Sequence, residues 1–276
     1  MKNTKLTIYT TIACLISFMP THAATLTWDG GGGDTDWSNG LNWNTNNAPT
    51  AGDTMVIGGS AVVDFNTNFT SSLSNGQVVI NISNTAQLNL NGGALSFADG
   101  NANTSPLNIG NDAVLNITGG DHNLYGRVDI FGEGTIRVTG DAATIDLRQL
   151  VKSGGPNTFE FIFDSTGVSS LDYYSYFGAA DQILYVDGSA YFDAYTGPYV
   201  PGGTQFKLIE TGNLSAQFQT ANVTIAGLGE EGNTGYGYIL TQDANDVYLT
   251  VFVPEPSSAA LLGLGGVALM LRRKRN

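Results

Sequence analysis

Short alternating segments between residues 77 and 150 constrain the fold of this chain more than any other feature. Within each segment, apolar and polar residues alternate, and Gly, Asn or Asp stand between the segments. A period of two residues is typical of half-buried β-strands. The predicted strands are 78–82, 87–90, 107–109, 114–117, 127–130, 135–138 and 144–147.

These predicted strands recur as a unit. Residues 108–120 align with residues 129–141 at a constant offset. Leu88 is equivalent to Leu115 in the same way, but the spacing between these two is longer, which an insertion in the intervening loop explains. A repeat of about 20–30 residues made of strands and turns is what a parallel β-solenoid requires. We therefore predict an all-β parallel β-helix with Ile, Leu and Val inside and Asn, Thr and Asp outside. An antiparallel β-sandwich is the alternative, because the strand spacing permits it too.

Composition excludes several kinds of function. The chain has 276 residues and a formal net charge of −13, and six of its 11 Lys and Arg residues lie at the two ends. A chain as acidic as this one repels the phosphate backbones of nucleic acids, which argues against a nucleic-acid partner. The single Cys and one of the two His residues fall within residues 1–23. Disulfides, cysteine nucleophiles and multi-histidine metal sites are therefore excluded from the rest of the chain, and we expect no cofactor.

The N-terminus has the features of a secretory signal peptide. Lys2 and Lys5 supply the positive charge, residues 6–19 form an apolar stretch, and Thr21-His22-Ala23 suits cleavage before Ala24. Residues 1–23 are therefore predicted to form a signal helix that is recognised by the secretion machinery.

The C-terminus carries a second targeting pattern. Two prolines in Pro254-Glu255-Pro256 cannot continue a strand ladder, so the fold is expected to end there. The apolar stretch 259–271 follows, which is short against the roughly 20 residues of a full transmembrane helix. The cations that end the chain are expected to stay on the cytoplasmic side. They are Arg272, Arg273, Lys274 and Arg275.

This order of Pro-Glu-Pro, short apolar helix and terminal cations resembles the PEP-CTERM sorting signal of Gram-negative bacteria. The resemblance implies recognition and processing by a membrane exosortase, in cells that usually make exopolysaccharide. It also implies anchoring in the inner membrane through the C-terminal helix before processing, and a surface or extracellular location afterwards. A membrane tail anchor that is never processed is the alternative.

All three tryptophans, Trp28, Trp37 and Trp43, stand near the start of the mature chain. The segment resembles the N-terminal part of autotransporter-like β-solenoid surface proteins, and we predict that its large aromatic rings cover the first coil. A glycan-binding platform is the alternative use of the tryptophans. Beside four glycines, Asp29, Asp34 and Asp36 form a weak candidate calcium site, although the favoured interpretation is that these carboxylates form turns.

After residue 156 the repeat is lost and aromatic residues increase, as in the tyrosine-rich segment 173–177. Residues 204–251 resemble the closing strands of the same autotransporter-like proteins, which predicts a C-terminal β cap. The tyrosines are expected to pack rather than to form a glycan-binding strip. The predicted organisation is signal peptide 1–23, N-terminal cap region 24–76, β-solenoid repeats 77–155, C-terminal β region 156–253 and PEP-CTERM signal 254–276.

No motif of acid–base or nucleophilic catalysis stands out. We expect Asp129 and Asp146 to face solvent, where they could share a groove, and His122 to be a loop residue without a partner. The charged candidates are Arg127, Asp129, Arg137, Asp146, Arg148 and Lys152. Our hypothesis is a non-enzymatic exported surface or extracellular-matrix protein associated with exopolysaccharide. The alternatives are a carbohydrate-binding adhesin and, less favoured, a polysaccharide lyase or hydrolase.

Overall fold

The computed structural model of the chain describes residues 24–71, 78–97, 105–177, 182–194, 204–211, 223–226, 237–243 and 246–252. The short helices are η1 (Gly40–Asn42) and α1 (Ser189–Ala194). The strands are β1 (Thr25–Thr27), β2 (Thr54–Ile57), β3 (Val62–Phe65), β4 (Asn68–Ser71), β5 (Ile80–Ile82), β6 (Gln87–Leu90), β7 (Ala94–Phe97), β8 (Leu107–Ile109), β9 (Val114–Ile117), β10 (Gly120–Phe131), β11 (Thr135–Thr139), β12 (Ala143–Ser153), β13 (Thr158–Ile162), β14 (Leu171–Phe177), β15 (Ile183–Asp187), β16 (Thr204–Thr211), β17 (Val223–Ala226), β18 (Gly237–Gln242) and β19 (Asp246–Phe252).

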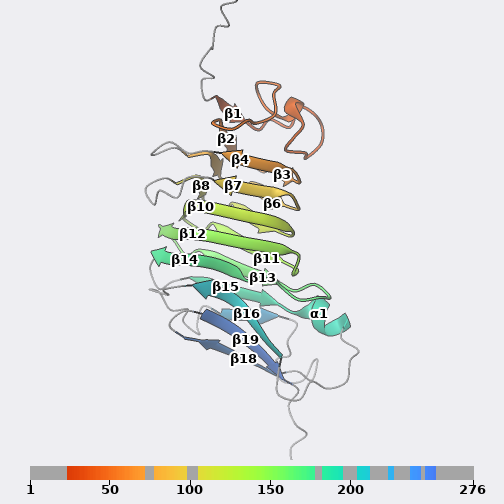
Figure 1. Cartoon of the computed structure of the whole chain (residues 1–276), viewed down its shortest axis with the longest axis vertical. Helices are drawn as coiled ribbons and strands as arrows, with labels where there is room; N and C mark the ends of the chain where they lie inside the picture. Colours follow the sequence, from red (N-terminus) through yellow and green to blue (C-terminus); the bar gives the residue numbers. More distant parts are fainter. Residues whose placement is uncertain are drawn as a thin grey trace, which may run out of the picture.

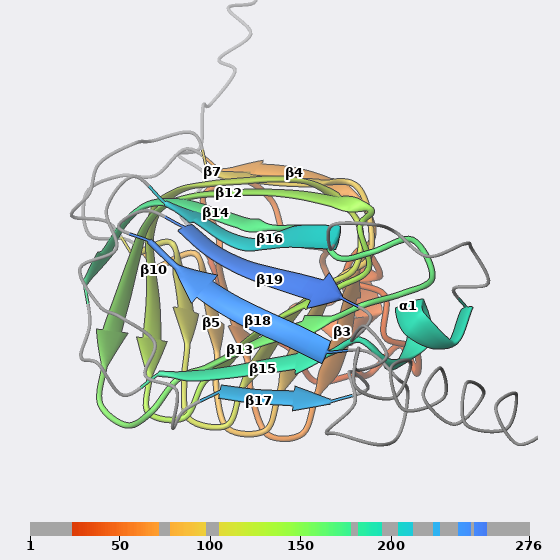
Figure 2. The same ribbon diagram turned by 90° about the horizontal axis from the view of Figure 1, so that it is seen from below.

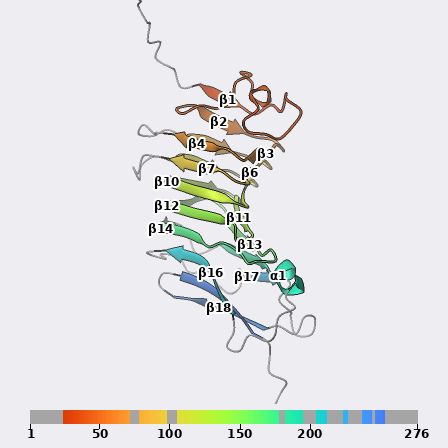
Figure 3. The ribbon, with the colours of Figure 1, turned by 45° about the vertical axis from the view of Figure 1, so that its right-hand side comes forward.

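The chain winds into a β-solenoid whose coils stack along the long axis of the molecule (Figures 1 and 3). Each early coil has one strand on each of three sides, such as β5, β6 and β7, which is visible along the axis in Figure 2. One side is a seven-stranded sheet in the order β17-β15-β13-β11-β9-β6-β3. The other two sides join into a single sheet because the long strand β10 bends from one to the other, with a register shift between Leu124 and Arg127.

Strand register confirms the repeat seen in the sequence. Ile109 lies opposite Ile130, and Leu88 lies opposite Leu115, as the alignment of the repeats predicts. Strands of neighbouring coils pair in parallel, so the antiparallel sandwich is excluded. The parallel pairing also reaches beyond residues 77–155 on both sides, from β1 with β2 to β15 with β17.

Apolar side chains stack in columns inside the coils. In six strands of the seven-stranded sheet, β3 to β15, the register places one such residue above the next, and each is no more than 1% exposed. Burial of a side chain of this size contributes about 1.5–3 kcal/mol, so the stacked column is one source of the stability of the body. The column consists of Val63, Leu88, Leu115, Ile136, Phe159 and Leu184.

The corner that enters the seven-stranded sheet repeats in successive coils. Gly59, Asn84 and Asp112 each adopt a positive φ there, between 56° and 67°. Gly, Asn and Asp tolerate this left-handed conformation better than other residues. The Gly, Asn and Asp residues between the predicted strands thus have a direct structural purpose.

The C-terminal end of the body departs from the parallel pattern. Strand β19 pairs antiparallel with both β16 and β18, which closes that end with an antiparallel edge. None of the helices in the described ranges is long and apolar enough to cross a membrane. The predicted signal helix at 1–23 and the predicted transmembrane helix within 254–276 lie outside the described residues.

Candidate functional site

The tryptophans form an aromatic cap over the first coil. Trp43 packs edge-on against Trp28 and Trp37, at ring-centroid distances of 5.2 and 5.1 Å, and Trp37 packs in the same way on Phe65 and Phe69. Trp43 also donates a hydrogen bond from Nε1 to the carbonyl of Trp37. Because Trp37 and Trp43 are at most 1% exposed, neither has a free ring face on which a sugar could stack.

Asn42 holds the cap loop together from a fully buried position. Its Nδ2 donates to Asp34 Oδ1 at 2.6 Å and to the carbonyl of Asp36 at 3.0 Å, while its Oδ1 accepts from the amide of Gly32. A Cβ at Gly32 would lie 2.6 Å from that Oδ1, so the loop requires glycine there. Hydrogen bonds from Asn42, Asn39 and the Asp36 amide lower the pKa of Asp34.

The three cap aspartates serve the turns of this loop. Asp36 Oδ1 accepts from the amide and hydroxyl of Ser38, and Asp29 Oδ1 accepts from the amide of Gly31. Within the described ranges, no group of three or more His, Cys, Asp or Glu side chains is placed to hold a metal ion. The hydrogen bonds of Asp29, Asp34 and Asp36 agree with the turn-forming interpretation of these carboxylates.

A column of polar side chains crosses the outer face of the seven-stranded sheet. One residue of each strand lies directly opposite the next, because the parallel register is unbroken from β3 to β17. The column consists of Asp64, Asn89, Asn116, Arg137, Glu160, Tyr185 and Thr224.

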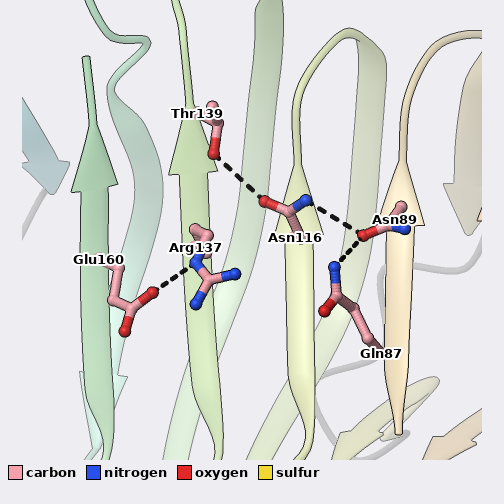
Figure 4. Close-up of polar contacts among 6 residues, drawn as sticks. All are labelled: Gln87, Asn89, Asn116, Arg137, Thr139 and Glu160. Atoms are coloured by element: carbon pink, nitrogen blue, oxygen red, sulfur yellow. Dashed lines mark hydrogen bonds and ion pairs between the residues drawn. The ribbon is translucent and has the colours of Figure 1, made fainter. Parts of the chain in front are cut away.

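Hydrogen bonds order the first half of this column, as Figure 4 shows for Asn89, Asn116 and Thr139. Thr139 donates to Asn116, Asn116 donates to Asn89 at 3.1 Å, and Asn89 donates to Asp64 at 2.7 Å. Burial alone would raise the pKa of Asp64, but hydrogen bonds from Thr35, Asn89 and Asn91 outweigh it and lower this pKa. The amide chain thus ends on an ionised carboxylate, and each amide has a fixed orientation.

The second half of the column lines an open groove of about 490 Å³. The strands β9, β11, β13 and β15 each contribute two half-buried side chains at alternate positions, and the second one from β9 is that of Thr118, the residue after the strand. The residues form two rows, one of Asn116, Arg137, Glu160 and Tyr185 and the other of Thr118, Thr139, Ile162 and Asp187.

Charge in the groove is largely balanced by one ion pair. Arg137 Nε donates to Glu160 Oε2 across β11 and β13 (Figure 4). Asp187 accepts a hydrogen bond from the Ser189 amide, at the start of helix α1. The groove therefore combines amide and hydroxyl groups, one ion pair, one further carboxylate and the ring of Tyr185. We take it as the candidate functional site.

The predicted surface groove with Asp129 and Asp146 is wrong. Asp129 is 4% exposed and forms an ion pair with Arg127 at 2.7 Å, with a further hydrogen bond from Ser105. Asp146 lies on another side of the coil, opposite Asp172. Burial, then the charges of Glu210 and Asp146, raise the pKa of Asp172.

The other charged candidates with described side chains are Arg137 and Arg148. Arg137 is on the seven-stranded sheet, whereas Arg148 is half-buried in β12. The Lys152 side chain, like those of residues 173–177, lies outside the described part of the structure.

His122 is a core residue rather than the loop residue that we predicted. It lies in β10, is fully buried, and has two backbone partners. Its Nδ1 accepts from the Leu95 amide at 3.2 Å, and its Nε2 is 2.8 Å from the Gly119 carbonyl. Burial lowers the pKa of this imidazole more than the Gly119 contact and Asp121 raise it. The neutral ring thus bridges two coils.

Sequence reasoning missed the groove although a signal for it was present. Asn89, Asn116 and Arg137 occupy the same outward position in three repeats of the strand pattern. Continuing this alignment through the aromatic region would have added Glu160 and Tyr185. The repeat had already become unrecognisable there, because larger aromatic residues such as Phe159 replace the aliphatic ones inside the coil.

Residues 252–275 match the PEP-CTERM protein-sorting motif, in agreement with the prediction for residues 254–276. The match begins at Phe252, the last residue of β19. The predicted sorting residues Pro254, Glu255, Pro256 and the cations 272–275 lie outside the described ranges. No curated protein and no solved structure matches the chain, so a relationship to autotransporter-like proteins stays a prediction. The chain thus combines a β-solenoid body with a PEP-CTERM motif, which implies an exported protein that is anchored in a membrane and then processed by an exosortase.

Proposed function

We propose that this protein is a non-enzymatic component of the cell surface or extracellular matrix, associated with the exopolysaccharide of the cells that export it. The PEP-CTERM motif at residues 252–275 is the observation that carries this proposal. Exosortase and the secretion machinery are its processing partners. The acidic body, with a chain net charge of −13, favours solubility and hydration within a polysaccharide layer.

The arrangement of charges supports a role without catalysis. A glycosidase needs two carboxyl groups in one groove, of which one is the general acid and the other is the general base or the nucleophile. In this groove the carboxylate of Glu160 is paired with Arg137, and that of Asp187 accepts a backbone amide. A stable, hydrogen-bonded surface fits a display or binding role better than a lyase or hydrolase.

The test is mass spectrometry of the exported protein together with fractionation of the cells. We expect a new C-terminus near residues 254–258 and recovery with the surface polysaccharide. Changing Pro254 and Pro256 to Ala is expected to leave the tail uncut, with the protein retained in the membrane fraction. An intact Asn276 in the surface fraction, or recovery free of polysaccharide in the medium, would contradict the proposal.

A further inference from the structure

We infer that the groove on β9, β11, β13 and β15 binds an extended, neutral polysaccharide lying along the solenoid axis. This inference rests on the proposed association with exopolysaccharide and gives it a site and a ligand class. Trp37 and Trp43 cannot supply such a site, because each is at most 1% exposed. Trp28 is partly buried and packs edge-on against Trp43.

The direction of the groove suits a polymer. Its two rows cross the strands, so they run along the axis on which the coils stack. Neighbouring strands are about 4.8 Å apart, which is close to the length of one sugar unit in an extended chain. Each strand can therefore present the same two positions to one successive sugar unit.

The side chains offer both kinds of contact that a sugar needs. Sugar rings have apolar C–H faces and polar edges, and the ring of Tyr185 and the side chain of Ile162 supply apolar surface. Around them, the polar groups of Asn116, Thr139 and Asp187 can exchange hydrogen bonds with hydroxyls.

Hydrogen bonds already fix part of this surface before a ligand arrives. Asn116 uses one N–H toward Asn89 and accepts from Thr139, which leaves its second N–H and further lone-pair capacity for a ligand. A side chain held in this way loses little conformational entropy on binding. The hydrogen-bonded amides in Figure 4 are therefore already oriented at one edge of the groove before a ligand binds.

Charge favours a neutral polymer over an acidic one. Glu160 offsets Arg137, so Asp187 leaves the groove lining with a net negative charge. The chain as a whole is also strongly acidic. Uronates and phosphorylated polymers would meet repulsion at this surface, whereas neutral hydroxyl-rich chains would not.

The test measures binding of the exported protein, recovered from the surface fraction, to immobilised neutral glucans and to polygalacturonate oligosaccharides of matched length. We expect retention on at least one neutral glucan that changes little with salt. Tyr185→Ala should weaken it by about tenfold, as loss of an aromatic anchor does, and Tyr185→Phe should largely restore it. The matched control is Tyr125→Ala, because Tyr125 is 42% exposed on another sheet. Circular dichroism of each variant checks the fold.

The outcomes separate this inference from the proposed function. Equal loss with Tyr125→Ala, or salt-sensitive binding of the acidic oligosaccharide alone, would overturn the neutral-glycan site. So would retention of the native polysaccharide by Tyr185→Ala at wild-type strength, although the association itself would then stand. Shortening of the glucan would contradict both, since it would show catalysis. Binding of neutral glucans without recovery in the native polysaccharide would support the groove and refute the association.

Discussion

The tryptophan cap and the groove on β9 to β15 use polar side chains in opposite ways. In the cap, Asn42 is fully buried and its amide serves Asp34, Asp36 and Gly32. In the groove, Arg137 and Tyr185 are half-buried and line an open volume. Polar groups satisfied in the interior stabilise the end of a solenoid, whereas ordered polar groups at the surface remain available to a ligand. The comparison therefore assigns stability to the cap and binding to the groove.

Removing the centre of the cap tests this assignment most strongly. Trp43→Ala is expected to reduce the free energy of unfolding by about 3–5 kcal/mol, because it leaves a cavity between Trp28 and Trp37. Guanidinium denaturation followed by circular dichroism measures this change.

The matched control for the cap is Leu41→Ala, since Leu41 is 57% exposed and a change of less than about 0.5 kcal/mol is expected. Glycan binding by folded Trp43→Ala should remain at the wild-type level. A loss of stability in Trp43→Ala below about 1 kcal/mol would mean that the cap unfolds independently of the coils. If that variant does not accumulate, Trp43→Phe provides the smaller perturbation.

Asn42→Ala tests the polar contacts of the cap separately, because it removes the Asn42 amide and leaves the tryptophans in place. We expect a loss of about 1–3 kcal/mol, because buried hydrogen-bonding groups lose their partner. Asn42 is also the largest cause of the lowered pKa of Asp34, so this pKa should rise toward its ordinary value in the variant. Carboxyl NMR titration measures that shift.

The sign of the pH effect follows from the lowered pKa of Asp34. This carboxylate contributes stability above its ordinary pKa, and the contribution is lost as the pH falls through the lowered value, below about pH 4. Asn42→Ala should therefore show a weaker acid dependence than the wild type. Asn47→Ala is the control, because exposed Asn47 bonds only its neighbour Thr45 among the contacts described. An unchanged titration of Asp34 would refute the role of Asn42.

The smallest effect on stability is expected in the groove. Arg137→Met should change the free energy of unfolding by less than about 1 kcal/mol, because the Arg137–Glu160 pair is partly exposed and screened by solvent. The double variant with Glu160→Gln measures the coupling between the two side chains. A coupling free energy above about 2 kcal/mol would show that this pair stabilises the fold, and the groove would then no longer differ from the cap in this respect.

The alternating strands and the alignment of their repeats were sufficient to predict the parallel solenoid, because stacked coils require each repeat to place the same residue type inside. The three tryptophans near the start likewise predicted a cap. A short apolar segment between Pro-Glu-Pro and terminal cations predicted the sorting motif. These features depend on local order along the chain, which a sequence displays directly.

Only the tertiary structure decided which polar residues meet. Alternation placed Asp129 outside, yet Asp129 lies buried against Arg127 and against Ser105, which comes from the preceding coil. His122 became a bridge between coils for a similar reason, since its partners belong to different turns of the solenoid. The groove arises because parallel register brings Arg137, Glu160 and Tyr185 together from three coils. The sequence by itself determined the repeating unit and the sorting motif, whereas the parallel register between stacked coils determined which side chains form the groove.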